Sequence, residues 1–173
     1  MKPQLTRLLI PRFLNSLYCF LRYGALVSPR AEVEVSRNLK LGKRARISSF
    51  VKIKTFSGPL SIGEEVAIAT GCFISADRGG ISIGRDTQIG PNCTIVSSSF
   101  RFDKLDTPIR DQPKGSLGVH IGPNVVLGAG VVILDGTHLG QGVVVAPNSV
   151  VSGRFEDNVV IDGSPAKVIF VRR

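Results

Sequence analysis

The chain contains two histidines, His120 and His138, whose imidazoles are the side chains best suited to proton transfer near neutral pH. They are 18 residues apart, and each directly precedes an aliphatic residue, Ile121 or Leu139. A structural repeat of the same length would stack the two rings about 4.8 Å apart on neighbouring turns, facing outward. Three interpretations are open: a base with an orienting partner, two metal ligands at a subunit interface, or two surface side chains without a role.

An aliphatic side chain recurs every six residues along most of the chain, and this period predicts the elements that hold the histidines. Fifteen hexads carry it, at Leu41, Ile47, Ile53, Ile62, Ile68, Ile74, Ile83, Ile89, Ile95, Ile121, Leu127, Ile133, Leu139, Val145 and Val151. The residue four positions further on is small or β-branched, so two inward positions alternate with outward ones. The pattern is typical of short strands joined by corners, three strands to a turn, in an all-β parallel β-helix. We expect about five coils.

The six-residue period fails between Ile95 and Ile121, and residues 97–119 are expected to leave the coil as a long loop. Long loops in compact folds are often functional, so this excursion is a candidate location for chemistry. Its carboxylates are Asp103, Asp106 and Asp111. A solvated aspartate, with a pKa near 3.9, is a weak base, which favours a role in ordering the loop or binding a substrate hydroxyl.

The two ends of the chain depart from the repeat. Residues 3–23 carry apolar side chains at helical spacing, three arginines and no acid, with Pro11 expected to break or kink the helix. The arginines argue against a membrane-spanning segment, and no clear cleavage site indicates a signal peptide. Two interpretations remain open: a cap over the first coil, and a basic amphipathic helix on an anionic membrane surface. We therefore divide the chain into a helical segment, 1–26, and a β-helix domain, 27–173, which ends in a closing strand.

The formal net charge of +9 is compatible with nucleic acid, anionic lipid or a phosphorylated small molecule as partner. Aromatic residues are sparse and no nucleic-acid-binding module is visible, so nucleic acid is not expected. Cys72 and Cys93 lie 21 residues apart, one coil, at equivalent inward positions. They are interpreted as reduced core thiols in a cytoplasmic protein, because further ligands for a redox or metal pair are not found nearby.

With the hexads, the excursion and the ending in view, the chain resembles the hexapeptide-repeat acyltransferases. It is most similar to the sugar O-acetyltransferases of polysaccharide and lipopolysaccharide assembly, related to maltose and galactoside acetyltransferases. The resemblance covers about residues 40–171 and is carried by IGPNCTI, FRFDKLDTPIRDQ, HIGPNVVLGAGVVILDG, VAPNSVV and GSPAKVI. It implies left-handed coiling, a homotrimer, and acetyl-CoA or another acyl-CoA as co-substrate in the cleft between subunits.

The resemblance also assigns coenzyme-binding positions. Ala129, Pro147, Ser152 and Lys167 match the family's contacts by place in the motifs. Lys167, together with Arg172 and Arg173, would supply the cationic cluster that coenzyme phosphates require. Each of these residues, considered alone, is also explained as an ordinary corner residue of the coil or as part of a solvated basic tail.

One position departs from the family pattern. Similar acetyltransferases open the excursion with a histidine that takes the proton from the sugar hydroxyl as it attacks the thioester, and Phe100 stands there in this chain. Loss of a general base typically costs about 100- to 10,000-fold in rate. Candidates to replace it are Asp103, His120 and His138. A γ-class carbonic anhydrase is excluded, because its zinc needs three histidines, and no metal site is expected.

The sequence therefore predicts a cytoplasmic acetyl- or acyl-CoA-dependent O-acyltransferase that acts on a sugar hydroxyl in surface polysaccharide biosynthesis. Peripheral attachment to the inner membrane face through residues 3–23 is a further expectation. Phe100 keeps open a catalytically impaired β-helix that serves as scaffold or regulatory protein. N-acylation of a nucleotide-linked amino sugar also stays open, since an amine acceptor can enter already deprotonated.

Overall fold

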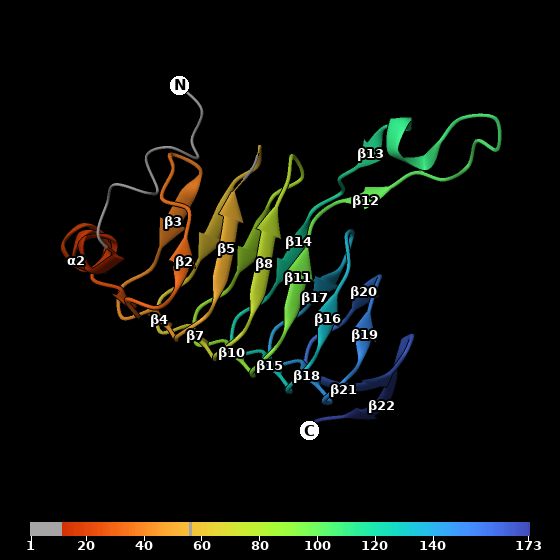
Figure 1. Ribbon diagram of the computed structural model, residues 1–173. Coiled ribbons are helices and arrows are strands. Elements are labelled where there is room, and N and C mark those ends of the chain that lie inside the picture. The colour runs from red at the N-terminus through yellow and green to blue at the C-terminus, as the bar shows by residue number, and fades with distance from the viewer. Residues whose placement is uncertain (1–11, 56) are drawn as a thin grey trace.

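The computed structural model describes residues 12–55 and 57–173, which form a parallel β-helix with three sheets (Figure 1). Sheet A contains β1 (Leu26–Val27), β4 (Arg46–Ile47), β7 (Ala67–Ile68), β10 (Gln88–Ile89), β15 (Val126–Leu127), β18 (Val144–Val145), β21 (Val159–Gly163) and β22 (Ala166–Val171). Sheet B contains β2 (Glu32–Val33), β5 (Lys52–Thr55), β8 (Phe73–Ala76), β11 (Thr94–Val96), β16 (Val132–Ile133) and β19 (Val150–Val151). Sheet C contains β3 (Leu39–Leu41), β6 (Leu60–Ile62), β9 (Ile81–Ile83), β14 (Val119–Ile121), β17 (His138–Leu139) and β20 (Arg154–Phe155).

The chain visits sheets A, B and C in turn, and, apart from β22, the strands of these sheets pair in parallel with strands of the neighbouring turns. Sheets B and C each hold six strands, so the stack has about six turns where five are predicted. The additional turn lies at the start, where Val27 and Val33 are already buried at a spacing of six. The predicted repeat is confirmed, and the predicted start at Leu41 is one turn late.

The aliphatic hexad positions fill the interior of the prism. Ile133 and its partner two residues earlier, Val131, are both fully buried, as the alternation of strand side chains requires. Cys72 and Cys93 are buried free thiols on neighbouring turns, and their Sγ atoms donate to the carbonyl oxygens of Gly90 and Gly128, each at 3.1 Å. Every buried side-chain nitrogen or oxygen among the described residues has a hydrogen-bond partner. The interior is therefore apolar and its few polar groups are satisfied.

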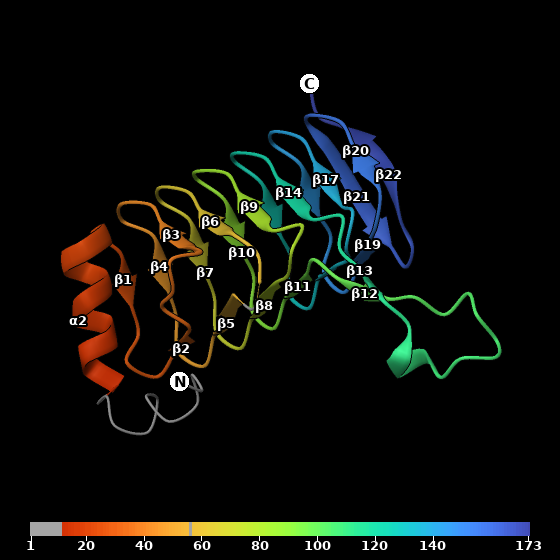
Figure 2. The same ribbon diagram turned by 90° about the horizontal axis from the view of Figure 1, so that it is seen from above.

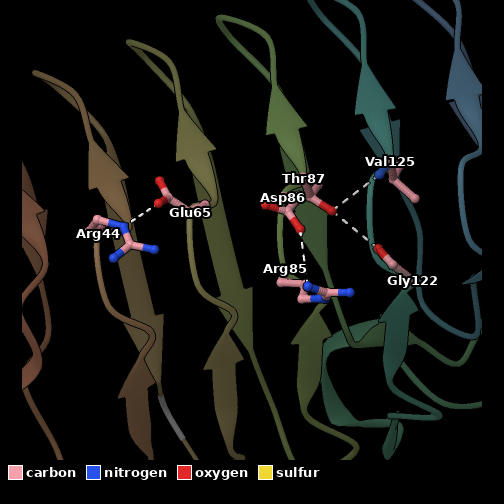
Figure 3. Close-up of polar contacts among 7 residues, drawn as sticks. All are labelled: Arg44, Glu65, Arg85, Asp86, Thr87, Gly122 and Val125. Atoms are coloured by element: carbon pink, nitrogen blue, oxygen red, sulfur yellow. Dashed lines mark hydrogen bonds and ion pairs between the residues drawn. The ribbon is translucent and has the colours of Figure 1, made fainter.

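The corner from sheet C to sheet A shows how successive turns are joined (Figure 3). The buried Thr87 hydroxyl donates to the carbonyl oxygen of Gly122 at 3.1 Å and accepts from the amide of Val125 at 3.3 Å. On the outside of the same corner, Arg44 forms an ion pair with Glu65 of the next turn. The buried hydroxyl replaces backbone partners that the corner itself lacks.

Gly84 lies at this corner where two turns approach too closely for a side chain. A Cβ added there would lie 2.4 Å from the backbone nitrogen of Pro123. We expect Gly84→Ala to lower the free energy of unfolding by about 1–3 kcal/mol, because the backbone must shift to admit the methyl group. Urea unfolding measures the effect. Gly115→Ala is the control, since its nearest contact would be 3.5 Å from the Ser99 side chain, and equal stability of the two variants contradicts the packing argument.

The excursion leaves the stack at the corner from sheet B to sheet C and projects away from it (Figure 2). It contains a two-stranded antiparallel ribbon, β12 (Ser99–Phe100) and β13 (Lys114–Gly115), and a short 3-10 helix at Ile109–Asp111. The buried Gln112 side chain accepts from the amide of Lys104 at 3.2 Å and donates to its carbonyl oxygen at 2.8 Å. The predicted loop is therefore present and has internal order of its own.

The two ends of the prism are covered differently. Helix α2 (Arg12–Tyr23) lies over the first turn, while residues 3–11 of the predicted helical segment, including Pro11, lie outside the described part of the chain. At the other end β22 pairs antiparallel with β21, as expected of a closing strand. Within the described residues, no helix is long and apolar enough to cross a membrane.

Candidate functional site

His120 and His138 stack face to face on the outer surface of sheet C. Strands β14 and β17 pair these two residues directly, with ring centroids 4.5 Å apart and ring planes inclined by 20°. The predicted stacking is confirmed. Because each residue sits between two inward-facing neighbours, strand alternation directs both rings outward.

The imidazole pair belongs to a longer polar row across sheet C. Ser82 on β9 lies opposite His120, and its Oγ is 2.7 Å from His120 Nδ1. Ser61 precedes Ser82 in the row, and Arg154 follows His138. The contact with Ser82 engages Nδ1 and fixes the ring orientation, so proton transfer to a ligand falls to the other ring nitrogen, Nε2.

A pocket of about 460 Å³ opens over this row at the corner between sheets B and C. It is lined by Pro59, Ser61, Gly79, Gly80, Ile81, Ser82, Leu117, Gly118, Val119, His120, Gly136, Thr137 and His138. Glycines at successive corners keep its wall free of side chains, and the exposed Leu117 stands at the end of the excursion. The two imidazoles, three hydroxyl side chains and an apolar rim thus share one concave surface, a combination common in small-molecule sites.

The pKa of His120 lies below the ordinary histidine value, first because the ring is partly desolvated at the pocket wall and then because of the nearby His138 and the positive charge of Arg154. His120 is therefore neutral at pH 7, the form that accepts a proton. The folded protein holds fewer protons on this ring than the unfolded chain, so the stability linked to it is present above about pH 6.5 and is lost as the pH falls.

We expect an NMR titration of the two imidazoles to show His120 protonating below the ordinary histidine pKa. With only two histidines in the chain, His138→Ala assigns the signals and also removes one of the neighbours that lower the pKa of His120. The His120 pKa should then rise. A midpoint above 6.5 for His120 in the unaltered protein contradicts this account of its surroundings.

The end of the excursion is fastened beside the pocket by Asp135. Its carboxylate accepts hydrogen bonds from the backbone amides of Leu117 and Gly118, each at 2.9 Å. The Ser116 hydroxyl, also near the end of the excursion, donates to the carbonyl oxygen of Ser97 at its start, at 2.6 Å. The two ends of the excursion are thereby held together at the pocket rim.

Asp103, one of the sequence-predicted candidates for the base, lies elsewhere, as does Phe100, which occupies the position where the resemblance expects the base. Asp103 is solvent-exposed in the excursion, where Arg101 Nε approaches its carboxylate at 3.3 Å. Phe100 is half-exposed on β12, with the Lys114 ammonium group 4.5 Å from its ring centroid. The described residues lining the pocket include neither of them, so the structure brings together His120 and His138 only.

Sequence reasoning missed Ser82 and Asp135. Ser82 directly precedes the hexad residue Ile83, as His120 and His138 directly precede theirs. That shared position in the hexad was a usable signal, but the inserted excursion places Ser82 and His120 38 residues apart in the sequence. Asp135 carried no comparable signal, because its partners are backbone amides at the far end of the excursion.

The six candidate coenzyme residues lie in different parts of the prism. Ala129 and Pro147 are exposed on successive turns at the corner from sheet A to sheet B. The hairpin before Lys167 reaches this corner, because the amide of Gly163 donates to Ser149 Oγ at 3.1 Å. Ser152 lies at the corner from sheet B to sheet C, on the pocket side.

The C-terminal arginines lie at the opposite end of β22. The guanidinium group of Arg172 donates to the carbonyl oxygen of Gly142 at 2.6 Å, and its amide donates to that of Asn158 at 2.7 Å. Arg173 follows it as the last residue and is exposed. Ala129, Pro147 and Lys167 are thus the candidates that share one corner. No group of three or more metal-ligating side chains occurs among the described residues.

Comparison with known sequences finds that a recognised repeat covers part of this site, including both histidines. Residues 118–153, which include both histidines, match the family model described as bacterial transferase hexapeptide (six repeats). WbbJ of Escherichia coli K12, named for O-acetyl transfer in lipopolysaccharide biosynthesis, is 54% identical over 54 residues, covering 31% of this chain and 28% of WbbJ. The acetyltransferase Rv3034c of Mycobacterium tuberculosis is 39% identical over 69 residues, or 40% of this chain and 23% of that protein. The chain thus matches about a quarter of the length of these relatives.

Solved structures share the architecture over a larger part of the chain. AntD, an N-acyltransferase from Bacillus cereus solved with dTDP and coenzyme A, superposes with a TM-score of 0.78 at 20% identity, covering 91% of this chain and 88% of AntD. PerB from Caulobacter crescentus, solved with CoA and GDP-perosamine, gives a TM-score of 0.64 at 22% identity, covering 92% of this chain and 66% of PerB. Residues 118–153 thus match the bacterial transferase hexapeptide model, and the chain as a whole shares its β-solenoid fold with AntD and PerB.

Proposed function

We propose that this protein is an acyl-CoA-dependent O-acyltransferase, with acetyl-CoA as the expected donor, that acts on a sugar hydroxyl in surface polysaccharide biosynthesis. The observation that carries the proposal is the stacked pair His120 and His138, oriented by Ser82, in a pocket beside the fastened end of the excursion. The local similarity to WbbJ supports the same activity and acceptor class. His120 takes the role that Phe100 cannot fill.

In this proposal His120, its neighbours and Ser82 each have a role. His120 Nε2 accepts the proton of the acceptor hydroxyl as its oxygen forms a bond to the thioester carbonyl carbon. The carbon–sulfur bond then breaks, and the imidazolium returns the proton to the departing thiolate. Ser82 holds the ring by Nδ1, while burial, His138 and Arg154 keep His120 neutral before the reaction.

The corner with Ala129 and Pro147 fits one wall of a coenzyme site. Its exposed residues are small or compact, and a Cβ on Gly128 would already lie 2.6 Å from the backbone nitrogen of Pro147. The turns therefore form a smooth surface along which an extended pantetheine arm could lie, with Lys167 nearby for a phosphate. Coenzyme bound there would supply the activated acyl group.

A complete site requires a second subunit. In a three-sided prism, the corner between sheets A and B is opposite sheet C, which carries the histidines. One chain cannot bring its own coenzyme corner to its own imidazole pair. We therefore include a homotrimer in the proposal, in which the corner of one subunit faces sheet C of its neighbour. A cytoplasmic location at the inner membrane face, where glycan acceptors are assembled, is also part of the proposal.

A titration of the protein's thermal stability with acetyl-CoA tests coenzyme binding. A ligand that binds only the folded state at about 100 times its dissociation constant adds about 2.7 kcal/mol to the free energy of unfolding. We expect a concentration-dependent rise in melting temperature with acetyl-CoA and a smaller one with adenosine. No rise at millimolar acetyl-CoA contradicts the proposal.

N-acylation of a nucleotide-linked amino sugar is the second candidate, favoured by the folds of AntD and PerB and by what those structures contain. An amine that enters deprotonated has less need of a base. Transfer to amino sugars that persists in His120→Ala would support N-acylation over O-acylation.

Phe100→His tests the position where the family resemblance expects the base. Because Phe100 lies on β12 and is covered by Lys114, a new imidazole there should leave the rate of acyl transfer within about threefold of the unaltered protein. Steady-state kinetics with one acceptor measure the difference. Transfer that appears in Phe100→His alone would show that the natural chain is a catalytically impaired scaffold.

A further inference from the structure

Helix α2 presents its two faces the opposite way from an ordinary surface helix. The polar groups point into the fold: the side-chain amide of Asn15 donates to the carbonyl oxygen of Val33 at 3.0 Å, and the Tyr23 hydroxyl donates to that of Leu39 at 3.2 Å. The buried Cys19 lies between them on the same face. A helix that only caps a soluble fold would bury its apolar stripe.

The apolar side chains of α2 face solvent instead. Six large ones are exposed, namely Phe13, Leu14, Leu17, Tyr18, Phe20 and Leu21, and Leu21 is 75% exposed. A groove of about 560 Å³ between the helix and the first strands of sheet A extends this surface to Leu26, with Arg46 at its edge. An apolar surface of this kind on one element marks a site of interaction with a partner or a membrane.

The positive charge of the protein is concentrated at this end. Residues 12–55, the described part of this end, contain ten basic and two acidic residues, whereas residues 57–173 contain ten basic and eleven acidic residues. The described part of this end therefore carries a net charge of +8, and the rest of the described chain carries −1. Some of these cations are paired, as Arg44 is with Glu65 and Lys54 with Glu32. Lys40, Lys43 and Arg46 are exposed on the first two turns.

We propose that this end of the β-helix docks on an anionic phospholipid bilayer. The outer face of α2 would enter the interface between headgroups and acyl chains, and the surrounding lysines and arginines would contact the lipid phosphates. Apolar burial and charge act together, which is the combination that stable peripheral attachment requires. The same helix caps the first turn through its polar face, so the two interpretations of this segment are compatible.

If the proposed function also holds, docking of the first turn on the bilayer determines how far the histidine pair lies from the membrane surface. His120 lies in the fourth turn and His138 in the fifth, three to four strand spacings, or about 14–19 Å, beyond the first turn. The acceptor would then be a glycan that extends from the membrane. Docking itself is measured without any acceptor, so it can fail or succeed independently of catalysis.

Vesicle flotation tests the proposal with the full-length chain. We expect the protein to float with vesicles of equimolar phosphatidylcholine and phosphatidylglycerol, to stay in solution with phosphatidylcholine alone, and to detach as the salt concentration rises. The double variant Lys43→Glu, Arg46→Glu should weaken binding by about 10- to 100-fold. The double variant Arg85→Glu, Arg110→Glu, at exposed cations outside the basic end, should bind like the unaltered protein.

The apolar contribution has its own matched pair. Leu17→Ser with Leu21→Ser should abolish flotation, whereas Val168→Ser with Ile169→Ser, which are 50% and 62% exposed at the opposite end, should not. Circular dichroism and the melting temperature establish that each variant is folded. Failure of the unaltered protein to float overturns the proposal, as does equal binding to neutral vesicles. A change of molecular mass in the Leu17, Leu21 variant without any vesicle binding would identify the surface as a contact between copies of the chain.

Discussion

Replacing His120 by alanine is expected to lower kcat/KM for acyl transfer by about 100- to 10,000-fold, the usual loss on removal of a general base. The ring is the one whose Nδ1 is held by Ser82 and whose surroundings keep it neutral. Because the side chain is exposed, the variant should fold with little change in stability. Acetyl-CoA should bind to it as tightly as before, so the loss should appear in kcat.

His138→Ala is the matched comparison for His120→Ala. It removes the stacked partner but leaves Ser82 and the proposed base, so the rate should fall less, and the acidic limb of the pH–rate profile should move to higher pH. Transfer unaffected by either substitution would exclude the pair from catalysis. In that case the carboxylates of the excursion, Asp103 first, would have to be reconsidered.

Asp135→Ala is expected to loosen the excursion and to reduce acyl transfer by about 10- to 100-fold while lowering the free energy of unfolding by about 1–3 kcal/mol. Its carboxylate holds the amides of Leu117 and Gly118, which form part of the pocket wall. Without it, both amides lose a charged acceptor and the rim loses its fixed position. Kinetics and urea unfolding measure the two effects.

Asp103→Ala is the control for Asp135→Ala. It removes an exposed carboxylate from the same excursion, one whose contact is with Arg101 and not with the pocket. We expect its rate and stability to stay close to those of the unaltered protein, since surface ion pairs contribute little. Equal losses of rate and stability in both variants would show that removing any carboxylate in or beside the excursion disturbs the site. The hydrogen bonds of Asp135 would then have no specific role in holding the pocket wall.

Periodicity predicted the fold well because it reports burial directly. Hexad residues such as Ile133 must enter the interior, and their spacing determines strand length and corner position together. The first turn was missed because its hexads, at Val27 and Val33, are followed by the less regular segment that leads to Leu39. The inverted helix α2 was harder to predict, since amphipathic spacing alone does not say which face meets the protein.

The candidate site was only partly predictable from the sequence. The spacing of 18 residues placed His120 above His138, because residues one turn apart must lie in register. The excursion lies between Ser82 and His120, so the spacing of 18 residues does not connect these two residues. The position of Phe100 depends on the path of the excursion, which is set by side chains such as Gln112. Long-range contacts of this kind, including that of Asp135, arise from the folded loop and leave no period in the sequence.

The most direct test of the central claim is to follow the two imidazole NMR signals while acetyl-CoA is added, with coenzyme binding measured in parallel by calorimetry. If the acyl group is delivered to the pocket, both signals shift in proportion to the bound fraction, and the pKa of His120 changes on saturation. Coenzyme A without the acetyl group should have a smaller effect on the signals. Tight binding of acetyl-CoA that leaves both imidazole signals and the His120 pKa unchanged would contradict the assignment of this pocket as the site of acyl transfer.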